Sequence, residues 1–488
     1  MQEERFEPLK GEDSGAKGKT QRKHRPPLSK DQKLQKFRSS SFSDSLDQSD
    51  NNDTGDCPYS TISCVRVTRL VTIPDQVRVE RSLRLPEFGP KILFFSGGTA
   101  IRDLSSCLKD YTHNSIHLIT PFDSGGSSAE IRRAFDMLSV GDLRNRLLAL
   151  AARDEATARN NPQIVEVFSH RLGMIDRDGA TKEFSSILGG HHPLMRAVQM
   201  PMRRILQNHL KWFACRMPID FDLREASIGN LIITGCFLEH DRDIVSVIFM
   251  ISKFLGVRGF CRPLTAANLH IRTLYDDGTE EVGQHLMNQQ HKDTPDDAIP
   301  LRKIVQIDLV DHLHSEERQQ SQKCHIDIVS SDLVASADLI VFPMGSFFAS
   351  ILVNLLPKGV GRAIVRRQCP KVYIPNTGCD PEMTSYTLAE CVQRIISMVQ
   401  EDCYRHSDRQ LETPPVPVSE ILNFVVIDTS HCHYSVEIDK DVITNLGVVI
   451  LDVPLVELEQ GESCKVTGSK SPRLDPRKVS EVLISLAS

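Results

Sequence analysis

A strand, a tight polar turn and a helix follow one another within residues 116–136, and this stretch constrains the fold more than any other part of the chain. The apolar run Ile116 to Ile119 predicts a buried strand, which Pro121 ends. Apolar residues at helical spacing begin after the turn and predict a helix. The turn consists of Asp123, Ser124, Gly125, Gly126, Ser127 and Ser128.

This turn is suited to an anionic ligand. Gly125 and Gly126 can adopt positive φ and let a ligand approach the backbone closely. We expect Ser127 or Ser128 to cap the helix, whose first amide groups point into the turn. Free N–H donors and the positive end of the helix dipole favour phosphate, and Asp123 adds a carboxylate at the end of the strand. A strand–turn–helix unit that binds nothing is the plainer alternative.

The composition is that of a soluble globular protein. The 488 residues, of which 40% are hydrophobic and 25% charged, predict two to four structural units. The net charge of −6 does not favour nucleic acid or an anionic membrane as a partner. Thirteen scattered cysteines without a C-x-x-C pair, no recognisable signal peptide and no apolar run long enough to cross a membrane predict a cytoplasmic protein.

Shifts in composition divide the chain. Residues 1–56 are polar, with segregated charge, and are predicted to be a disordered tail. Alternating apolar residues, as at 77–79, predict an N-terminal β extension over 57–90. The α/β domain is expected over 91–460, and a C-terminal loop and helix over 461–488.

Within the α/β domain, four apolar runs are predicted to be neighbouring strands of one Rossmann-like, mainly parallel sheet with helices on both faces. A further strand is expected at 325–329. Residues 155–256 are predicted to be a mostly helical insertion, and turn residues at 276–279 predict a β-hairpin over 268–285 that leaves the sheet. The four runs are residues 91–95, 116–120, 338–342 and 371–375.

Two more glycine turns follow predicted strands and can meet the first turn at one edge of the sheet. No G-x-G-x-x-G pattern follows the first strand, so an NAD-dependent oxidoreductase is disfavoured. The first of these turns contains Gly97, Gly98 and Thr99, and the second contains Gly345 and Ser346.

Four polar residues near the ends of other elements complete the candidate site. Asp142 either caps a helix or points into the site. Arg144 pairs either with phosphate or with a carboxylate of the fold. Asn230 begins a buried apolar run and needs a partner, and Asn376 follows the last of the four strands.

Paired histidines invite a metal interpretation at one further place. His191 and His192 follow two glycines and interrupt the helical part. An exposed loop or a phosphate contact is favoured for them over a metal site.

The order of these turns resembles the CofD/YvcK-like family over about residues 90–460. That family includes 2-phospho-L-lactate transferases and the gluconeogenesis factors, which are regulators of carbon flux that bind a nucleotide-sugar. The finer pattern looks like a CofD-like branch of its own rather than either of these two. The motifs that carry the resemblance are Gly97 to Thr99, Asp123 to Ser128, Gly141 to Arg144, Gly229 to Leu231, Gly345 and Ser346 with Asn354, and Asn376.

One departure from the family pattern bears on chemistry. The regulator branch has two adjacent aspartates before its Gly-Gly pair, and this chain has Asp123 followed by Ser124. Loss of one carboxylate weakens a two-acid metal site. It leaves a phosphate cradle intact, because such a cradle is made of backbone amides.

The resemblance implies two classes of function. The first is a transferase that moves a phosphate-containing group from a nucleotide-activated phosphate ester to a small-molecule hydroxyl, with Mg²⁺ on Asp123 and with Asp123 and Asp142 as catalytic acids. The second is a non-catalytic regulator that binds a nucleotide-sugar in the same place. A nucleotide or nucleotide-sugar is the expected partner in both cases, and a homodimer is left open.

Overall fold

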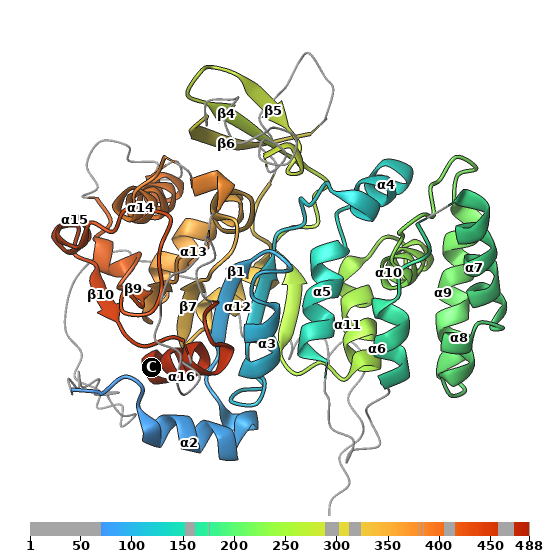
Figure 1. Ribbon diagram of the computed structural model, residues 1–488, viewed down its shortest axis with the longest axis horizontal. Coiled ribbons are helices and arrows are strands. Elements are labelled where there is room, and N and C mark those ends of the chain that lie inside the picture. The colour runs from blue at the N-terminus through green and yellow to red at the C-terminus, as the bar shows by residue number, and fades with distance from the viewer. Residues whose placement is uncertain are drawn as a thin grey trace, which may run out of the picture. The chain divides into compact units, whose positions relative to one another are not determined.

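Seven strands form the central sheet in the order β10-β9-β8-β7-β1-β2-β3, and every neighbouring pair is parallel (Figure 1). The sheet confirms the α/β, Rossmann-like fold and makes the four predicted strands neighbours. The strands are β1 Ile92–Ser96, β2 Ile116–Ile119, β3 Phe260–Pro263, β7 Leu339–Phe342, β8 Lys371–Tyr373, β9 Phe424–Ile427 and β10 Val449–Asp452.

The computed structural model describes nine stretches of the chain. The predicted tail at 1–56 and most of the loop in 461–488 lie outside them. The described residues are 70–151, 162–174, 176–287, 302–311, 324–378, 380–383, 385–404, 415–456 and 473–487.

Helices cover both faces of the sheet because its strands are apolar on both sides. Ile92 and Phe94 of β1 belong to a core with α2 (Gln76–Arg84), α3 (Arg102–Leu108) and α16 (Pro476–Leu486). Leu93 and Phe95 face a second core on the opposite side. That core contains η3 Phe347–Ile351, η4 Leu352–Leu355, α13 Val360–Arg366 and α14 Leu388–Tyr404.

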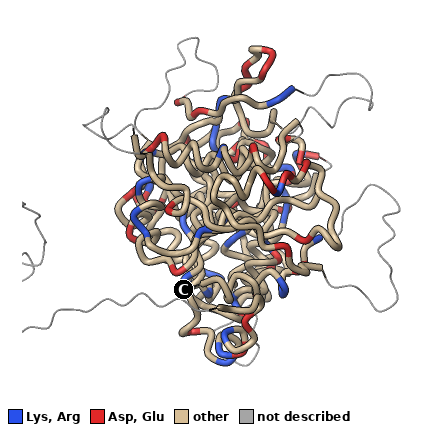
Figure 2. The backbone as a smooth tube through the Cα atoms, turned by 90° about the vertical axis from the view of Figure 1, so that its left-hand side faces the viewer, with Lys and Arg blue, Asp and Glu red and all other residues tan. Residues whose placement is uncertain are grey.

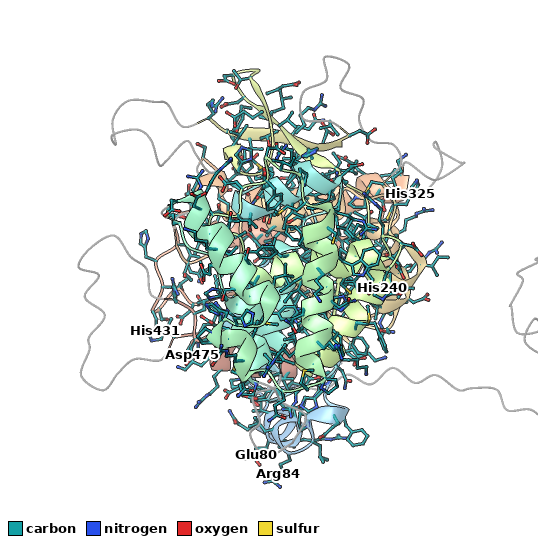
Figure 3. All side chains as sticks on the ribbon, turned by 90° about the vertical axis from the view of Figure 1, so that its right-hand side faces the viewer. Glu80, Arg84, His240, His325, His431 and Asp475 are labelled. Atoms are coloured by element: carbon teal, nitrogen blue, oxygen red, sulfur yellow. The ribbon has the colours of Figure 1, made fainter. Side chains whose placement is uncertain are left out.

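A helical part with its own core follows β2, as expected for residues 155–256, and Figure 3 looks onto it. Its centre is α10, in which ten of twelve residues are buried. Gly235 lets α9 approach α10 closely, since a Cβ there would collide with the carbonyl of His209. The helices are α4 Gly126–Phe135, α5 Gly141–Leu150, α6 Pro162–Ser169, α7 Arg177–Gly189, α8 Pro193–Ala197, α9 Met202–Arg216, α10 Ile228–Glu239 and α11 Ile244–Leu255.

A separate antiparallel sheet, in the order β5-β4-β6, lies near the start of α4 (Figure 1). The hairpin expected over 268–285 is formed by β4 (His270–Tyr275) and β5 (Glu280–Val282), and Gly278 takes φ 82° in its turn. The third strand, β6 (Ile304–Val310), follows a polar segment and was not predicted.

Two predicted strands are wrong. The alternation at 77–79 belongs to helix α2, which Asp75 caps by accepting the N–H of Arg78 at 3.2 Å and whose Val79 is buried. The strand expected at 325–329 is replaced by the start of α12 (Ile328–Ala335), because Asp327 caps that helix. A short alternation does not distinguish a strand from one face of a helix.

The remaining elements connect these layers. No helix in the nine described stretches is both long and apolar enough to span a bilayer. Acidic and basic residues are interspersed over the face seen in Figure 2. The remaining elements are η1 Pro86–Phe88, η5 Pro381–Met383, η6 Val418–Glu420 and α15 Lys440–Asn445.

Candidate functional site

The three glycine turns are numbered here in chain order, and the first, Gly97 to Thr99, packs against Asp142 at the carboxyl edge of the sheet. A Cβ on Gly98 would lie 2.6 Å from the Cα of Asp142, so only glycine fits there. The N–H of Gly98 donates to the Asp142 carboxylate. Asp142 lies in the first turn of α5, whose N-cap residue is Val140, so Asp142 points to the glycine turn and is not a cap. Buried Arg146 donates to the carbonyl of Gly97 at 2.9 Å and fixes the turn.

The second turn, Asp123 to Ser128, brings Asp123 beside α5. Asp123 Oδ1 accepts the N–H of Gly125 at 3.0 Å, and a Cβ on Gly141 would lie 3.2 Å from Asp123 Oδ2. Gly126 takes φ +47°, whereas Gly125 has φ −98°. In the first turn, Thr99 follows the two glycines and precedes α3.

The predicted capping by Ser127 or Ser128 is wrong. Helix α4 begins at Gly126, with Gly125 as its N-cap, so both serines lie inside the first turn. Ser127 Oγ instead accepts the Asn230 side-chain amide at 3.3 Å. Ser128 is buried against Gly141.

Ser124 contacts His285 through its hydroxyl group. Its Oγ lies 2.9 Å from Nδ1 of His285 and accepts the backbone N–H of His285 at 3.2 Å. Ser124 therefore ties the turn to the segment after β5. His285 was missed by sequence reasoning, because a lone histidine in a polar segment gives no signal.

The third turn, which contains Gly345 and Ser346, is held by Asn376. The N–H of Gly345 donates to Asn376 Oδ1 and the Asn376 amide donates to the carbonyl of Gly345, both at 2.8 Å. Gly345 takes φ +153°, and a Cβ there would lie 3.6 Å from that of Ala100, beside the first turn. The three turns therefore share one edge of the sheet. Ser346 precedes η3, which is a π-helical turn.

Two buried acids support this third turn and were not predicted. Asp380 accepts the N–H of Phe347 at 3.0 Å, and Glu382 accepts those of Phe348 and Ala349 at 2.7 and 2.8 Å. Burial, followed by the neighbouring Asp380 carboxylate, raises the pKa of Glu382 to about 8. These acids hold the start of η3 because they accept hydrogen bonds from its first backbone amides.

Arg144 and Asn230 are buried residues with unfilled hydrogen-bonding capacity, as are Arg146 at Nε, Glu382 at Oε1 and Asn354 at Oδ1 among the described residues of the site. Arg144 is 5% exposed, and its Nη2 donates to Asn145 at 2.6 Å, while its Nε and Nη1 have no partner in the described part of the chain. Asn230 is 1% exposed, and its Oδ1 likewise has no described partner. Gly229 makes room for the guanidinium, since a Cβ there would lie 2.8 Å from Arg144 Cδ. A bound anion would supply the acceptor that Arg144 lacks.

Opposite charges meet around this residue. Burial lowers the pKa of Arg144 to about 10; Arg171 and Arg102 act in the same direction, and Asp142 and Asp123 oppose them. Burial, followed by the Asp123 carboxylate, raises the pKa of Asp142 to about 7. The hard oxygen donors of Asp123 and Asp142 are of the kind that Mg²⁺ prefers, so these residues fit that ion.

Fold and site together define a Rossmann-like α/β protein whose three glycine turns meet at the carboxyl edge of its sheet. A family model described as 2-phospho-L-lactate transferase CofD matches residues 92–456, and the chain belongs to the CofD family.

Curated relatives of the chain carry the name gluconeogenesis factor. The chain is 27% identical to that of Listeria monocytogenes, over 59% of this chain and 67% of the relative. It is 25% identical to that of Bacillus subtilis, over 63% and 74%. A crystal structure of a UPF0052 family member from Bacillus halodurans is similar in fold, with a TM-score of 0.55, 21% identity, and 81% of this chain and 99% of that one covered.

Proposed function

We propose that this protein binds a nucleotide-activated phosphate ester at its three glycine turns and transfers a phosphate-containing group to a small-molecule hydroxyl. The observation that carries the proposal is the buried guanidinium of Arg144, which has unpaired donors beside a carboxylate pair. A buried N–H donor without an acceptor is costly, and phosphate oxygens would supply the acceptors. The match to the CofD transferase family supports the same reaction class.

The residues divide the work according to their chemistry. Arg144 and the amide groups at the start of α4 would bind phosphate oxygens. Asp142, whose pKa is raised to about 7, can accept the proton of the attacking hydroxyl near neutral pH. The acceptor oxygen bonds to phosphorus, the bond to the nucleoside monophosphate breaks, and the acceptor proton passes to Asp142. Mg²⁺ held by Asp123 would supply charge neutralisation on the phosphates.

The second candidate is a non-catalytic regulator that binds a nucleotide-sugar in the same place. It is favoured by Ser124, which stands where the second carboxylate of the regulator pattern would be and is engaged with His285. The gluconeogenesis factor relatives support this candidate at low identity.

A thermal-shift screen of nucleotides and nucleotide-sugars, with and without Mg²⁺, tests the shared binding step. A ligand that binds the folded state raises Tm, by an amount that corresponds to about 2.7 kcal/mol at a concentration of 100 Kd. The matched pair of variants is Arg144→Gln and Arg133→Gln, since Arg133 is exposed and pairs with Glu130 at 2.7 Å. Only Arg144→Gln should lose the shift. Equal shifts in both variants would reject the site.

Product analysis then separates the two candidates. Wild-type protein that binds a nucleotide-sugar but releases no nucleoside monophosphate with any acceptor hydroxyl is a regulator. Release that is lost in Asp142→Asn, with binding retained, identifies the transferase.

A further inference from the structure

A second cluster of potential ligands lies in the helical part. His170 follows α6, Glu183 lies in α7, and His192 precedes α8. One side-chain atom from each of the three lies within 4.8 Å of the others. His170 Nε2 is 2.7 Å from Glu183 Oε1, and His192 Nε2 is 3.9 Å from the same oxygen.

The arrangement matches the requirements of a zinc ion. Tetrahedral zinc with bonds of about 2.0–2.1 Å sets its ligand atoms about 3.3 Å apart, and the separations of 2.7 and 3.9 Å lie on either side of that value. Two histidines and one glutamate are a known donor set for zinc, with water in the fourth position. The three side chains are 22–26% exposed, so an ion and its water can enter from solvent.

Backbone contacts hold the carboxylate in place. Glu183 Oε2 accepts the N–H of Gly173 at 3.0 Å, which leaves Oε1 facing the two histidines. Such outer contacts orient metal ligands. His192 Nδ1 accepts the N–H of Leu194 at 3.4 Å. Binding of a metal at Nε2 would move the ring proton to Nδ1 and give up this long contact.

We propose that His170, Glu183 and His192 bind Zn²⁺ or a similar divalent transition metal. The ion would join α6, α7 and α8 at one point. It would also fix the position of Arg171, which follows His170 directly. The backbone of Arg171 forms an antiparallel β-bridge with Ser227, the N-cap residue of α10. This metal site is independent of the proposed function, because none of its three ligands belongs to the glycine turns.

Zinc titration of the metal-stripped full chain tests the proposal. The variants His170→Gln, His192→Gln and Glu183→Gln each remove one ligand, and Glu183→Gln keeps an oxygen for Gly173. His191→Gln is the matched control, since His191 is exposed and outside the cluster. Wild type and His191→Gln should bind one Zn²⁺ that the ligand variants bind about 100-fold more weakly or not at all, a loss at or above that seen when outer contacts are removed.

Two further readouts keep the test decisive. The chain has 13 cysteines that can also take up zinc, so the result is the difference between variants rather than the total bound. Co²⁺ should give the visible spectrum of a tetrahedral ion in wild type and His191→Gln and lose it in the ligand variants. Zn²⁺ should raise Tm in the same two proteins only. Equal zinc stoichiometry and equal Tm shifts in all five proteins would overturn the proposal.

Discussion

Replacement of Arg144 by methionine should stabilise the ligand-free protein and abolish nucleotide binding. In the free protein, two nitrogens of this buried guanidinium have no described partner. Each unsatisfied buried group costs about 1–3 kcal/mol, so two cost about 2–6 kcal/mol, whereas the single hydrogen bond from the charged guanidinium to Asn145 returns about 1.5–3 kcal/mol. Arg144→Met should therefore gain about 1 kcal/mol or more. Because 1 kcal/mol shifts Tm by about 2–4 °C in domains of 150–250 residues and by less in larger ones, we expect a rise of roughly 2 °C.

Arg146→Met is the matched control. Arg146 lies two residues along the same helix and is fully buried, but it donates to the carbonyls of Ile101 and Gly97, both at 2.9 Å, and to Ser105. Hydrogen bonds from charged groups contribute about 1.5–3 kcal/mol each, so this variant should lose about 3 kcal/mol or more. The assay is calorimetric unfolding of wild type and both variants, with and without nucleotide.

Ligand should reverse the order of wild type and Arg144→Met. At 100 Kd the nucleotide stabilises wild type by about 2.7 kcal/mol and leaves Arg144→Met unchanged. If Arg144→Met lowers Tm as much as Arg146→Met does, then Arg144 is a satisfied structural residue. The same conclusion follows if nucleotide raises the Tm of Arg144→Met and of wild type equally.

Four other predictions concern the carboxylates and the turns. Asp123→Asn should make nucleotide binding independent of Mg²⁺, as measured by titration calorimetry. It should also raise the activation free energy of the transfer by about 3 kcal/mol, as measured from the rate of product release. Unchanged Mg²⁺ dependence would remove Asp123 from the site. The pKa of Asp142 is raised from 3.8 to about 7, so the folded state binds a proton that the unfolded state has lost, and the free energy of unfolding should fall as pH rises from about 4 to 7. Asp142→Asn should flatten that fall when stability is measured by urea titration, and parallel curves for the two proteins would contradict the prediction. Asn376→Ala should lower stability by about 1–3 kcal/mol, because it leaves both backbone groups of Gly345 unpaired, and a neutral result in thermal unfolding would show that water replaces the amide. Ser124→Asp should leave Mg²⁺ affinity unchanged, because the new carboxylate would face His285; a tenfold gain in calorimetry would show that it reaches the ion instead.

The parallel sheet could be predicted from local sequence because its signals are local. Buried parallel strands are continuous apolar runs, and β1 and β7 each end at a glycine turn. The error at α2 has the opposite cause. Val79 is buried by contacts with the distant C-terminal helix, and three alternating residues contain no information about that partner.

The sequence names the residues of the candidate site, but it does not reveal how they contact one another. The order of family motifs singled out Arg144 and Asn230, yet their unfilled hydrogen-bonding capacity depends on how α5 and α10 pack. Asp380 and Glu382 could not be predicted, because they accept hydrogen bonds from backbone amides of a turn more than thirty residues away in the chain. The sequence places Ser124 in the ligand-binding turn and at the position of the missing second carboxylate, but it gives no sign of the contact with His285, which lies 161 residues further on.

These contacts show where the stability of the site comes from. Arg146, Asn376, Asp380 and Glu382 use their hydrogen bonds on the backbone of the turns, so the cradle is held in shape without a ligand. Arg144 and Asn230 lie in the same edge of the sheet with groups left unpaired. Arg146 Nε and Glu382 Oε1 also have no described partner, so an unpaired atom alone does not mark a ligand contact. Arg144 differs from Arg146 in that its guanidinium makes no hydrogen bond to the backbone of the turns among those described, and the proposed ligand contact therefore rests on Arg144 more than on any other residue of the site.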